Sequence, residues 1–228
     1  MYISDIRVEA SNAIPKSNDE FVFRRTTHHV RQIFLHFIGR RFVLDGSAVF
    51  QITCGPKPEH AVEGQHLGST EHYVEDFDFD AYRSKSPSER EQTILKLIQA
   101  VMKKYCNNAT AKEEIDKAIH EVIEHQIQLR LSIAKLSRLS NDKKLKLMVY
   151  RNLGADVGET WTVDIMNRGG SLIGTECMTS SPCFLDRTTH FSKSRWQGNV
   201  FEVISQRLQK VEYSLDTSNY MDVIQSRP

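Results

Sequence analysis

The sequence has few cysteines, no long apolar run and no excess of charge of either sign. Its four cysteines, Cys54, Cys106, Cys177 and Cys183, include no C-x-x-C pair and are too sparse in 228 residues for a disulfide framework, so we expect a reducing compartment. No apolar run approaches the roughly 20 residues of a membrane-spanning helix. The start of the chain lacks the basic-then-apolar pattern of a signal peptide. We therefore expect a cytoplasmic protein that has no membrane among its partners.

The balance of charge limits the function further. The formal net charge is +1, so the global basic excess that supplies non-specific nucleic-acid binding is missing, and we do not expect a nucleic-acid partner. The charge is uneven along the chain, since residues 71–91 contain seven acidic and three basic side chains, whereas residues 130–151 contain seven basic and one acidic. An uneven surface of this kind can steer a protein partner.

The first 70 residues favour short strands around one helix. Alternating apolar residues predict a strand over 1–10, and residues 20–25 suit another short strand. Helical spacing of apolar residues predicts a helix between Thr27 and Gly39, although the same segment also suits a strand. The Asp45-Gly46 dipeptide predicts the turn of a hairpin over 41–54. A loop rich in glycine and proline follows over 55–70.

The stretch from His72 to Cys106 is the most informative part of the chain, and it opens with H-Y-V-E-D-F-D-F-D. Its alternation predicts an acidic strand that carries Asp76, Asp78 and Asp80 on one face and Phe77 and Phe79 on the other. Three like charges this close repel each other. A basic partner surface or a divalent cation with oxygen ligands would relieve that repulsion, and a merely solvated face is the third interpretation.

Two helices with clear start signals come next. Ser86 and Glu89 form a capping-box pattern around Pro87, and apolar residues then follow at helical spacing up to Tyr105. Thr110 and Glu113 repeat the pattern and predict a second helix that runs to about Leu139. Because the link between them is short, we predict a long helical hairpin over 86–139.

The remainder of the chain changes character. Residues 143–178 alternate apolar and polar side chains and predict an antiparallel meander. A last helix is predicted from about Ser194, and residues 214–228 form a polar tail. We find no linker-like break and predict a single α+β domain over 1–213, with antiparallel sheets packed against the helical hairpin and the C-terminal helix.

Other candidate sites carry weaker signals. His60, His66 and His72 recur every six residues without a known metal spacing, and Cys177 and Cys183 lie near His190 without a nucleophile motif. We therefore predict no catalytic residue, no metal and no cofactor. A basic stretch could bind phosphates, but its simpler interpretation is a solvated face. It comprises Arg130, Lys135, Arg138, Lys143, Lys144, Lys146 and Arg151.

One segment resembles a known family. The pattern F-D-F-D-A-Y followed by S-P-S-E-R-E-Q-T-I-L-K-L-I-Q-A-V-M-K is similar to that of small bacterial immunity proteins from polymorphic-toxin and contact-dependent growth inhibition systems, over about 35 of 228 residues. The resemblance implies a non-enzymatic protein that binds and neutralises a toxin domain, which is often basic. The contact surface would then comprise Glu75, Asp76, Asp78 and Asp80.

Two other functions stay open. The same aspartates, together with His72, could serve a metal-dependent hydrolase. Alternatively, the helical hairpin could be an interaction module that self-associates through 110–139. The oligomeric state does not follow from the sequence.

Overall fold

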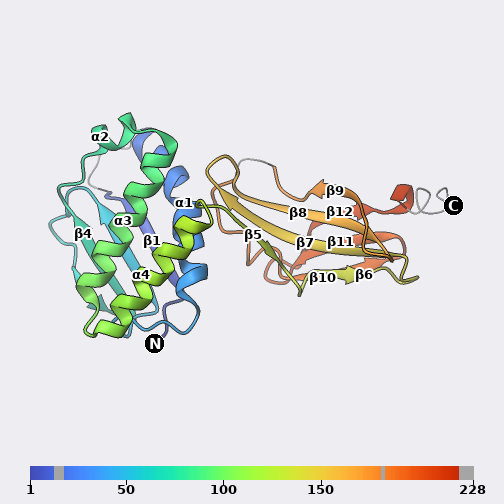
Figure 1. Ribbon diagram of the computed structural model, residues 1–228, viewed down its shortest axis with the longest axis horizontal. Coiled ribbons are helices and arrows are strands. Elements are labelled where there is room, and N and C mark those ends of the chain that lie inside the picture. Colours follow the sequence, from blue (N-terminus) through green and yellow to red (C-terminus); the bar gives the residue numbers. More distant parts are fainter. Residues whose placement is uncertain (13–17, 181–182, 221–228) are drawn as a thin grey trace. The chain divides into compact units, whose positions relative to one another are not determined.

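The chain folds into two compact units, each with its own hydrophobic core. The computed structural model describes residues 1–12, 18–180 and 183–220 (Figure 1). Unit 1 comprises residues 1–129 and 153–158, and unit 2 comprises residues 130–152 and 159–228. We predicted one domain over 1–213 because no linker is visible in the sequence. The chain instead passes between the units next to or inside strands, where no glycine- or proline-rich stretch is needed.

Unit 1 combines a mixed sheet with four helices. Its strands are β1 (Asp5–Ala10), β2 (Val49–Cys54), β3 (Gly64–His66) and β4 (Ser69–Val74), and its helices are α1 (Asn18–Ile38), α2 (Phe79–Ser84), α3 (Pro87–Tyr105) and α4 (Ala109–Glu124). The strand order is β1-β2-β4-β3, in which β1, β2 and β4 run parallel and β3 runs antiparallel to β4. The α+β class is thus confirmed, but this sheet is not antiparallel as predicted.

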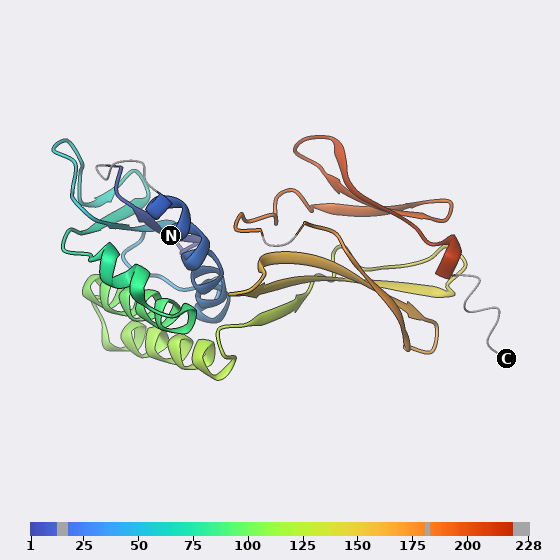
Figure 2. The same cartoon turned by 90° about the horizontal axis from the view of Figure 1, so that it is seen from above.

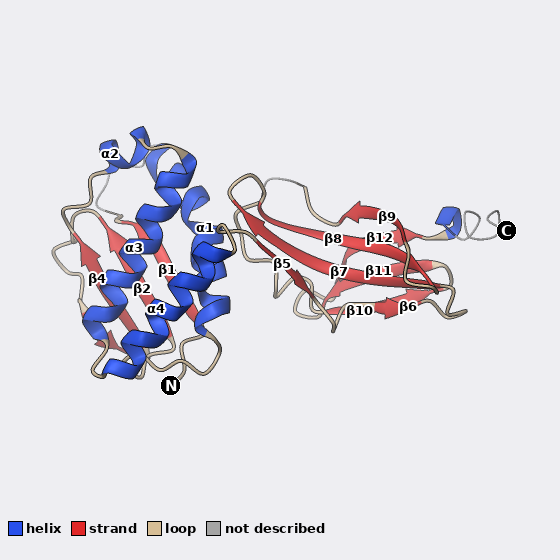
Figure 3. Ribbon diagram, in the orientation of Figure 1, coloured by secondary structure: helices blue, strands red, loops and turns tan. Residues whose placement is uncertain are grey.

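The sheet of unit 1 is covered by helices on one face. On β1, Ile6 and Val8 are buried whereas Arg7 and Glu9 are exposed, so alternate side chains point to the core and to the open face. Figure 3 shows α1, α3 and α4 on the same side of these strands. The uncovered face is polar, which suits a sheet with one solvated side.

Helix α1 begins earlier than the sequence predicted. Buried Phe23, Thr27, Val30 and Phe34 follow one another at intervals of three or four residues and form one continuous stripe. The short strand predicted over 20–25 is therefore wrong. Gly39, with φ +83°, ends the helix as predicted.

The hairpin predicted over 41–54 is also wrong, although its turn exists. Gly46 does adopt φ +94°, but the chain then enters β2, which pairs in parallel with β1. Helix α1 is the crossover that allows this parallel pairing. Phe42 and Leu44 are buried in a loop. Their alternating apolar side chains gave the same sequence pattern as a strand.

Helix α3 has the predicted cap. The Ser86 hydroxyl accepts from the Glu89 amide, and the Glu89 carboxylate accepts from the Ser86 amide at 2.8 Å. Such a cap contributes about 1 kcal/mol. The predicted stripe is buried at Ile94, Leu95, Ile98, Val101 and Met102.

Helix α4 ends at Glu124, so the helical hairpin predicted to reach residue 139 is not confirmed. The helix closes in a Schellman motif, in which the amide of Ile127 donates to the carbonyl of Val122 and that of Gln126 to the carbonyl of Ile123. Gln126 and Ile127 both have positive φ. No glycine marks this stop, and the apolar spacing continues past it by coincidence.

Unit 2 consists of two antiparallel sheets around one core. Its strands are β5 (Leu129–Ser132), β6 (Arg138–Leu139), β7 (Leu145–Gly154), β8 (Gly158–Asn167), β9 (Leu172–Cys177), β10 (Lys193–Gln197), β11 (Val200–Ser205) and β12 (Lys210–Asp216). One sheet has the order β5-β7-β8-β9 with β6 beside β7, and the other has the order β10-β11-β12. Figure 2 shows the two sheets as separate layers, and the predicted meander forms most of the first.

The predicted C-terminal helix is wrong, because residues 193–216 form β10, β11 and β12. Val200, Val203 and Ile204 match a helical spacing, but Phe201 and Val203 alternate into the core as a strand requires. The tail predicted over 214–228 begins inside β12, and its residues 221–228 lie outside the described part of the chain. Among the helices that the structure describes, none has the length and apolar character needed to cross a membrane.

Candidate functional site

The predicted acidic strand face does not exist. Strand β4 ends at Val74, and Glu75 and Asp76 lie in the turn that follows. Asp78 is the N-cap of α2, where its carboxylate accepts from the Ala81 amide at 2.8 Å. Asp80 lies inside α2 and pairs with Arg83. The hydrolase interpretation required three aspartates on one strand face, an arrangement that the structure contradicts.

The aromatic residues between these aspartates explain the turn. Phe77 and Phe79 both contact the ring of buried Phe23, with centroids 5.4 Å apart in each case. Tyr82 joins the same cluster. Phe77 and Phe79 both point toward Phe23, whereas the acidic residues that alternate with them are exposed. In the sequence this produces the same alternation as a strand. The N-cap at Asp78, however, directs the backbone into a helix.

Glu75 and Asp76 border a pocket of unit 1. The pocket has a volume of about 370 Å³ and lies between the end of β4 and the side of α3; its lining comprises His72, Tyr73, Val74, Glu75, Asp76, Leu97, Ala100, Val101 and Lys104. Both carboxylates are exposed, and neither has a hydrogen bond or ion pair within the described ranges. The pocket thus combines an apolar wall from α3 with two available negative charges.

A buried histidine is part of the lining of this pocket. His72 is 8% exposed, and its Nδ1 lies 2.6 Å from the Glu63 carboxylate and 3.2 Å from the Tyr105 hydroxyl. Desolvation would raise the pKa of Glu63, but hydrogen bonds from the His72 ring and the Tyr73 amide outweigh it and lower that pKa. Burial and a hydrogen bond with Glu71 raise the pKa of Tyr73 to about 12. Glu63 and Tyr105 thus hold the His72 ring in place.

The sequence reasoning missed Glu63, although a signal for it was present. Leu67 and Gly68 both have positive φ and form the turn between β3 and β4. A hairpin centred there places Gly64 opposite Glu71, and the next pair outward is Glu63 and His72. Interpreting Leu67-Gly68 as a hairpin turn would therefore have predicted the pair.

Replacing Glu63 by glutamine should remove a pH-dependent contribution to the stability of unit 1. A carboxyl group whose pKa is lowered by folding stabilises the fold above its ordinary pKa, and this contribution is lost as the pH falls through the lowered value. Because Glu63 is exposed, solvent screens its interaction with His72, and we expect Glu63→Gln to lower the free energy of unfolding by about 0.5 kcal/mol at pH 7. The difference from wild type should begin to shrink as the pH falls below the ordinary glutamate pKa of about 4.3.

Urea unfolding between pH 3 and 7, followed by circular dichroism at 222 nm, measures this effect, because all the labelled helices belong to unit 1. Glu59→Gln is the control, since Glu59 is an exposed residue just before β3. A difference between Glu63→Gln and wild type that stays constant over this pH range would contradict the assignment.

The other candidate residues do not assemble into a site. His60 and His66 are exposed, and within the described ranges no three side chains of histidine, cysteine, aspartate or glutamate are grouped to hold a metal ion. Cys177 and Cys183 are free thiols. Within the described residues, neither thiol has a hydrogen bond to His190.

The basic stretch lies on unit 2 and is partly used internally. Arg130 pairs with Asp164 at 2.6 Å and stacks on the Tyr150 ring at 3.8 Å, so the one aromatic residue of the stretch is already covered. Arg151 is buried against Glu159. Exposed cations remain at Lys135, Arg138, Lys143, Lys144 and Lys146.

The two units carry opposite net charge. Unit 1 has 16 basic and 20 acidic side chains and a net charge of −4, whereas unit 2 has 14 basic and 9 acidic side chains and a net charge of +5. The pocket therefore belongs to the acidic unit. Comparison of the chain with family models, with curated proteins and with solved structures finds no match.

Proposed function

We propose that this chain is a non-enzymatic binding protein of the cytoplasm, similar in role to an immunity protein or antitoxin, which neutralises a basic partner domain. The observation that supports it is the pair of exposed carboxylates at the border of the pocket, Glu75 and Asp76, which have no partner among the described residues. An arginine or lysine of the partner can lay its aliphatic stem on Leu97 and Val101 and its charged head against the carboxylates. Asp78 and Asp80 add charge nearby but already have partners.

A rescue experiment tests this function. The chain is co-expressed with the product of the reading frame next to its own gene, and growth is recorded. We expect that product to arrest growth by itself and the chain to restore growth. Binding of the two purified proteins, measured by calorimetry, should weaken about tenfold for each carboxylate removed in Glu75→Gln and Asp76→Asn.

Two matched variants serve as controls. Glu113→Gln/Glu114→Gln removes two exposed charges from α4 of the same unit and should leave binding within about twofold. Asp78→Asn keeps a residue that can cap α2 and should have a small effect. A neighbouring product that neither arrests growth nor binds the chain would overturn the proposal, as would equal losses for Glu75→Gln/Asp76→Asn and Glu113→Gln/Glu114→Gln.

A further inference from the structure

A second exposed surface of unit 1 lies at the amino ends of its parallel strands. Met1, Tyr2, Val43 and Leu67 are 71%, 56%, 45% and 100% exposed. The Ile3 amide donates to the Phe42 carbonyl at 2.9 Å, which places Tyr2 beside Val43. The terminal methyl group of Met1 approaches the Leu67-Gly68 turn, 3.3 Å from where a Gly68 Cβ would lie. We call Met1, Tyr2, Arg40, Arg41, Val43 and Leu67 the amino-end patch.

Leu67 is in an unfavourable position for a leucine. Its φ is +47°, and Gly68 follows with φ +80°, the combination that a type I′ hairpin turn requires and that asparagine-glycine satisfies best. A leucine with positive φ loses free energy, and complete exposure gives it no burial in return. Its side chain therefore contributes no burial to unit 1 and is fully accessible for an external contact.

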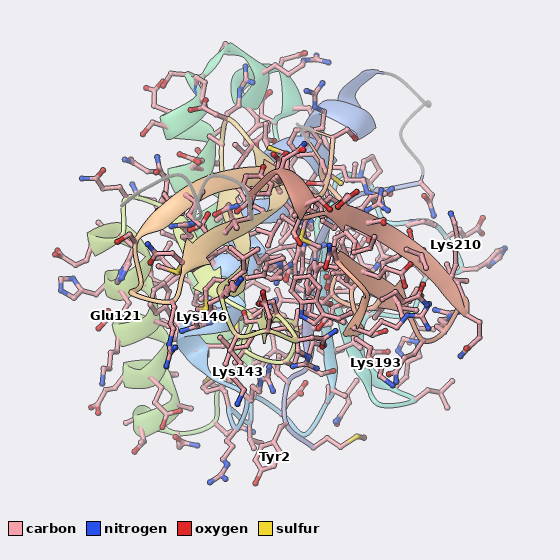
Figure 4. The ribbon with its side chains drawn as sticks, turned by 90° about the vertical axis from the view of Figure 1, so that its right-hand side faces the viewer. Tyr2, Glu121, Lys143, Lys146, Lys193 and Lys210 are labelled. Atoms are coloured by element: carbon pink, nitrogen blue, oxygen red, sulfur yellow. The ribbon has the colours of Figure 1, made fainter. Side chains whose placement is uncertain are left out.

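The patch is also cationic. Arg40 and Arg41 are exposed, and neither has an ion pair or hydrogen bond to another described residue. Figure 4 shows Tyr2 projecting away from the ribbon. The patch thus offers protruding apolar side chains with two positive charges beside them.

The pocket of the same unit has the complementary character. It presents an apolar wall from Leu97, Ala100 and Val101 beside the exposed carboxylates of Glu75 and Asp76. These two carboxylates follow the carboxyl end of β4, whereas Leu67 precedes its amino end. Patch and carboxylates therefore lie at opposite ends of the parallel strands of this mixed sheet and cannot meet within one copy.

We propose that the occupant of the amino-end patch is a second copy of this chain, joined head to tail. Leu67 of one copy packs on the apolar wall of the next copy's pocket, and Arg40 and Arg41 approach Glu75 and Asp76 there. Because the two contacting surfaces differ, the contact is heterologous and continues into a ring or a filament. The chain's net charge of +1 opposes this little.

The inference uses the pocket of the proposed function but does not rest on any toxin. Self-association and partner binding would compete for Glu75 and Asp76. Association is measured on the chain alone and rescue is measured with the partner, so either one can fail while the other stands.

Sedimentation velocity over a range of concentrations tests the proposal. Wild type should sediment as a series of oligomers that grows with concentration. Leu67→Asn should weaken association at least tenfold and yet raise the urea midpoint of unit 1, because asparagine tolerates positive φ. This opposite response separates a lost contact from a lost fold. Leu208→Asn, at an exposed leucine in a turn of unit 2, should change neither property.

Mixing two defective variants identifies the contact. The patch variant Leu67→Asn/Arg41→Gln and the pocket variant Glu75→Gln/Asp76→Asn should each be monomeric alone. Their equimolar mixture should form a dimer that does not grow, because only one live patch meets one live pocket. Lys104→Gln should tighten wild-type association by removing the ammonium of the pocket lining. A monomeric wild type at about 1 mM, or a mixture that stays monomeric while wild type associates, would overturn the proposal.

Discussion

Replacing Glu159 by glutamine is expected to destabilise unit 2 by about 3–5 kcal/mol. Glu159 is fully buried, and its carboxylate accepts from Arg151 Nη2 at 2.6 Å, from Trp161 Nε1 at 2.8 Å and from the Arg187 amide at 2.9 Å. A glutamine of the same shape leaves the buried Arg151 charge without its main counterion. Asp186, which is 3.5 Å from Arg151 and partly exposed, compensates only in part.

Tryptophan fluorescence during urea unfolding measures this loss selectively. Both tryptophans of the chain, Trp161 and Trp196, belong to unit 2, so their signal follows that unit alone. Glu202→Gln is the matched control, since it breaks a pair in the same unit whose arginine, Arg195, is 46% exposed; we expect a change of about 1 kcal/mol or less. Equal losses for Glu159→Gln and Glu202→Gln would refute the importance of burial here.

Replacing Glu91 by leucine should destabilise unit 1 by about 3 kcal/mol. Adding His29→Leu should restore the lost stability. His29 Nε2 lies 2.5 Å from the Glu91 carboxylate, and the two residues are 2% and 9% exposed. The other ring nitrogen of His29 has no hydrogen-bond partner among the described residues. Glu91→Leu alone therefore leaves the buried His29 ring without this hydrogen-bond partner, whereas the double variant replaces the pair with apolar contacts.

Circular dichroism at 222 nm during urea unfolding follows unit 1 in this experiment. The double variant His29→Leu/Glu91→Leu should be at least as stable as wild type and can exceed it by 1–4 kcal/mol, roughly, as other buried pairs have done. The control, His120→Leu/Glu124→Leu, removes an exposed pair 4.0 Å apart on α4 and should change the stability by under about 0.5 kcal/mol. A double variant less stable than wild type would show that the pair is a net stabilising interaction and would contradict this prediction.

The sequence predicted correctly those elements that are specified by residues close together in the chain, such as a capping box or an apolar alternation. The start of α3 follows from Ser86, Pro87 and Glu89, and the meander follows from alternation such as Leu145, Leu147 and Val149, all buried. The end of α4 failed because a glutamine and an isoleucine took the positive φ that usually marks a glycine. The parallel pairing of β2 with β1 was not predicted, because it depends on the crossover helix between the two strands.

The site was predicted only where it is local. Glu75 and Asp76 were named from the sequence, but on a strand face that does not form. Leu97 and Lys104 reach the pocket from α3, and Glu63 reaches His72 across a hairpin. Such contacts depend on the packing of elements that are distant in sequence. The contact surface itself, and the toxin-neutralising role, remain predictions.

The interleaved arrangement of the two units has a consequence for synthesis on the ribosome. Residues 153–158 belong to unit 1, and Leu153 is part of its core, yet they follow β5, β6 and the first part of β7 of unit 2 in the chain. Domains generally fold in order from the amino terminus as they emerge. Here, unit 1 stays incomplete until residue 158 has left the exit tunnel. The nascent chain therefore exposes unfinished strands of unit 2 before its first core is closed.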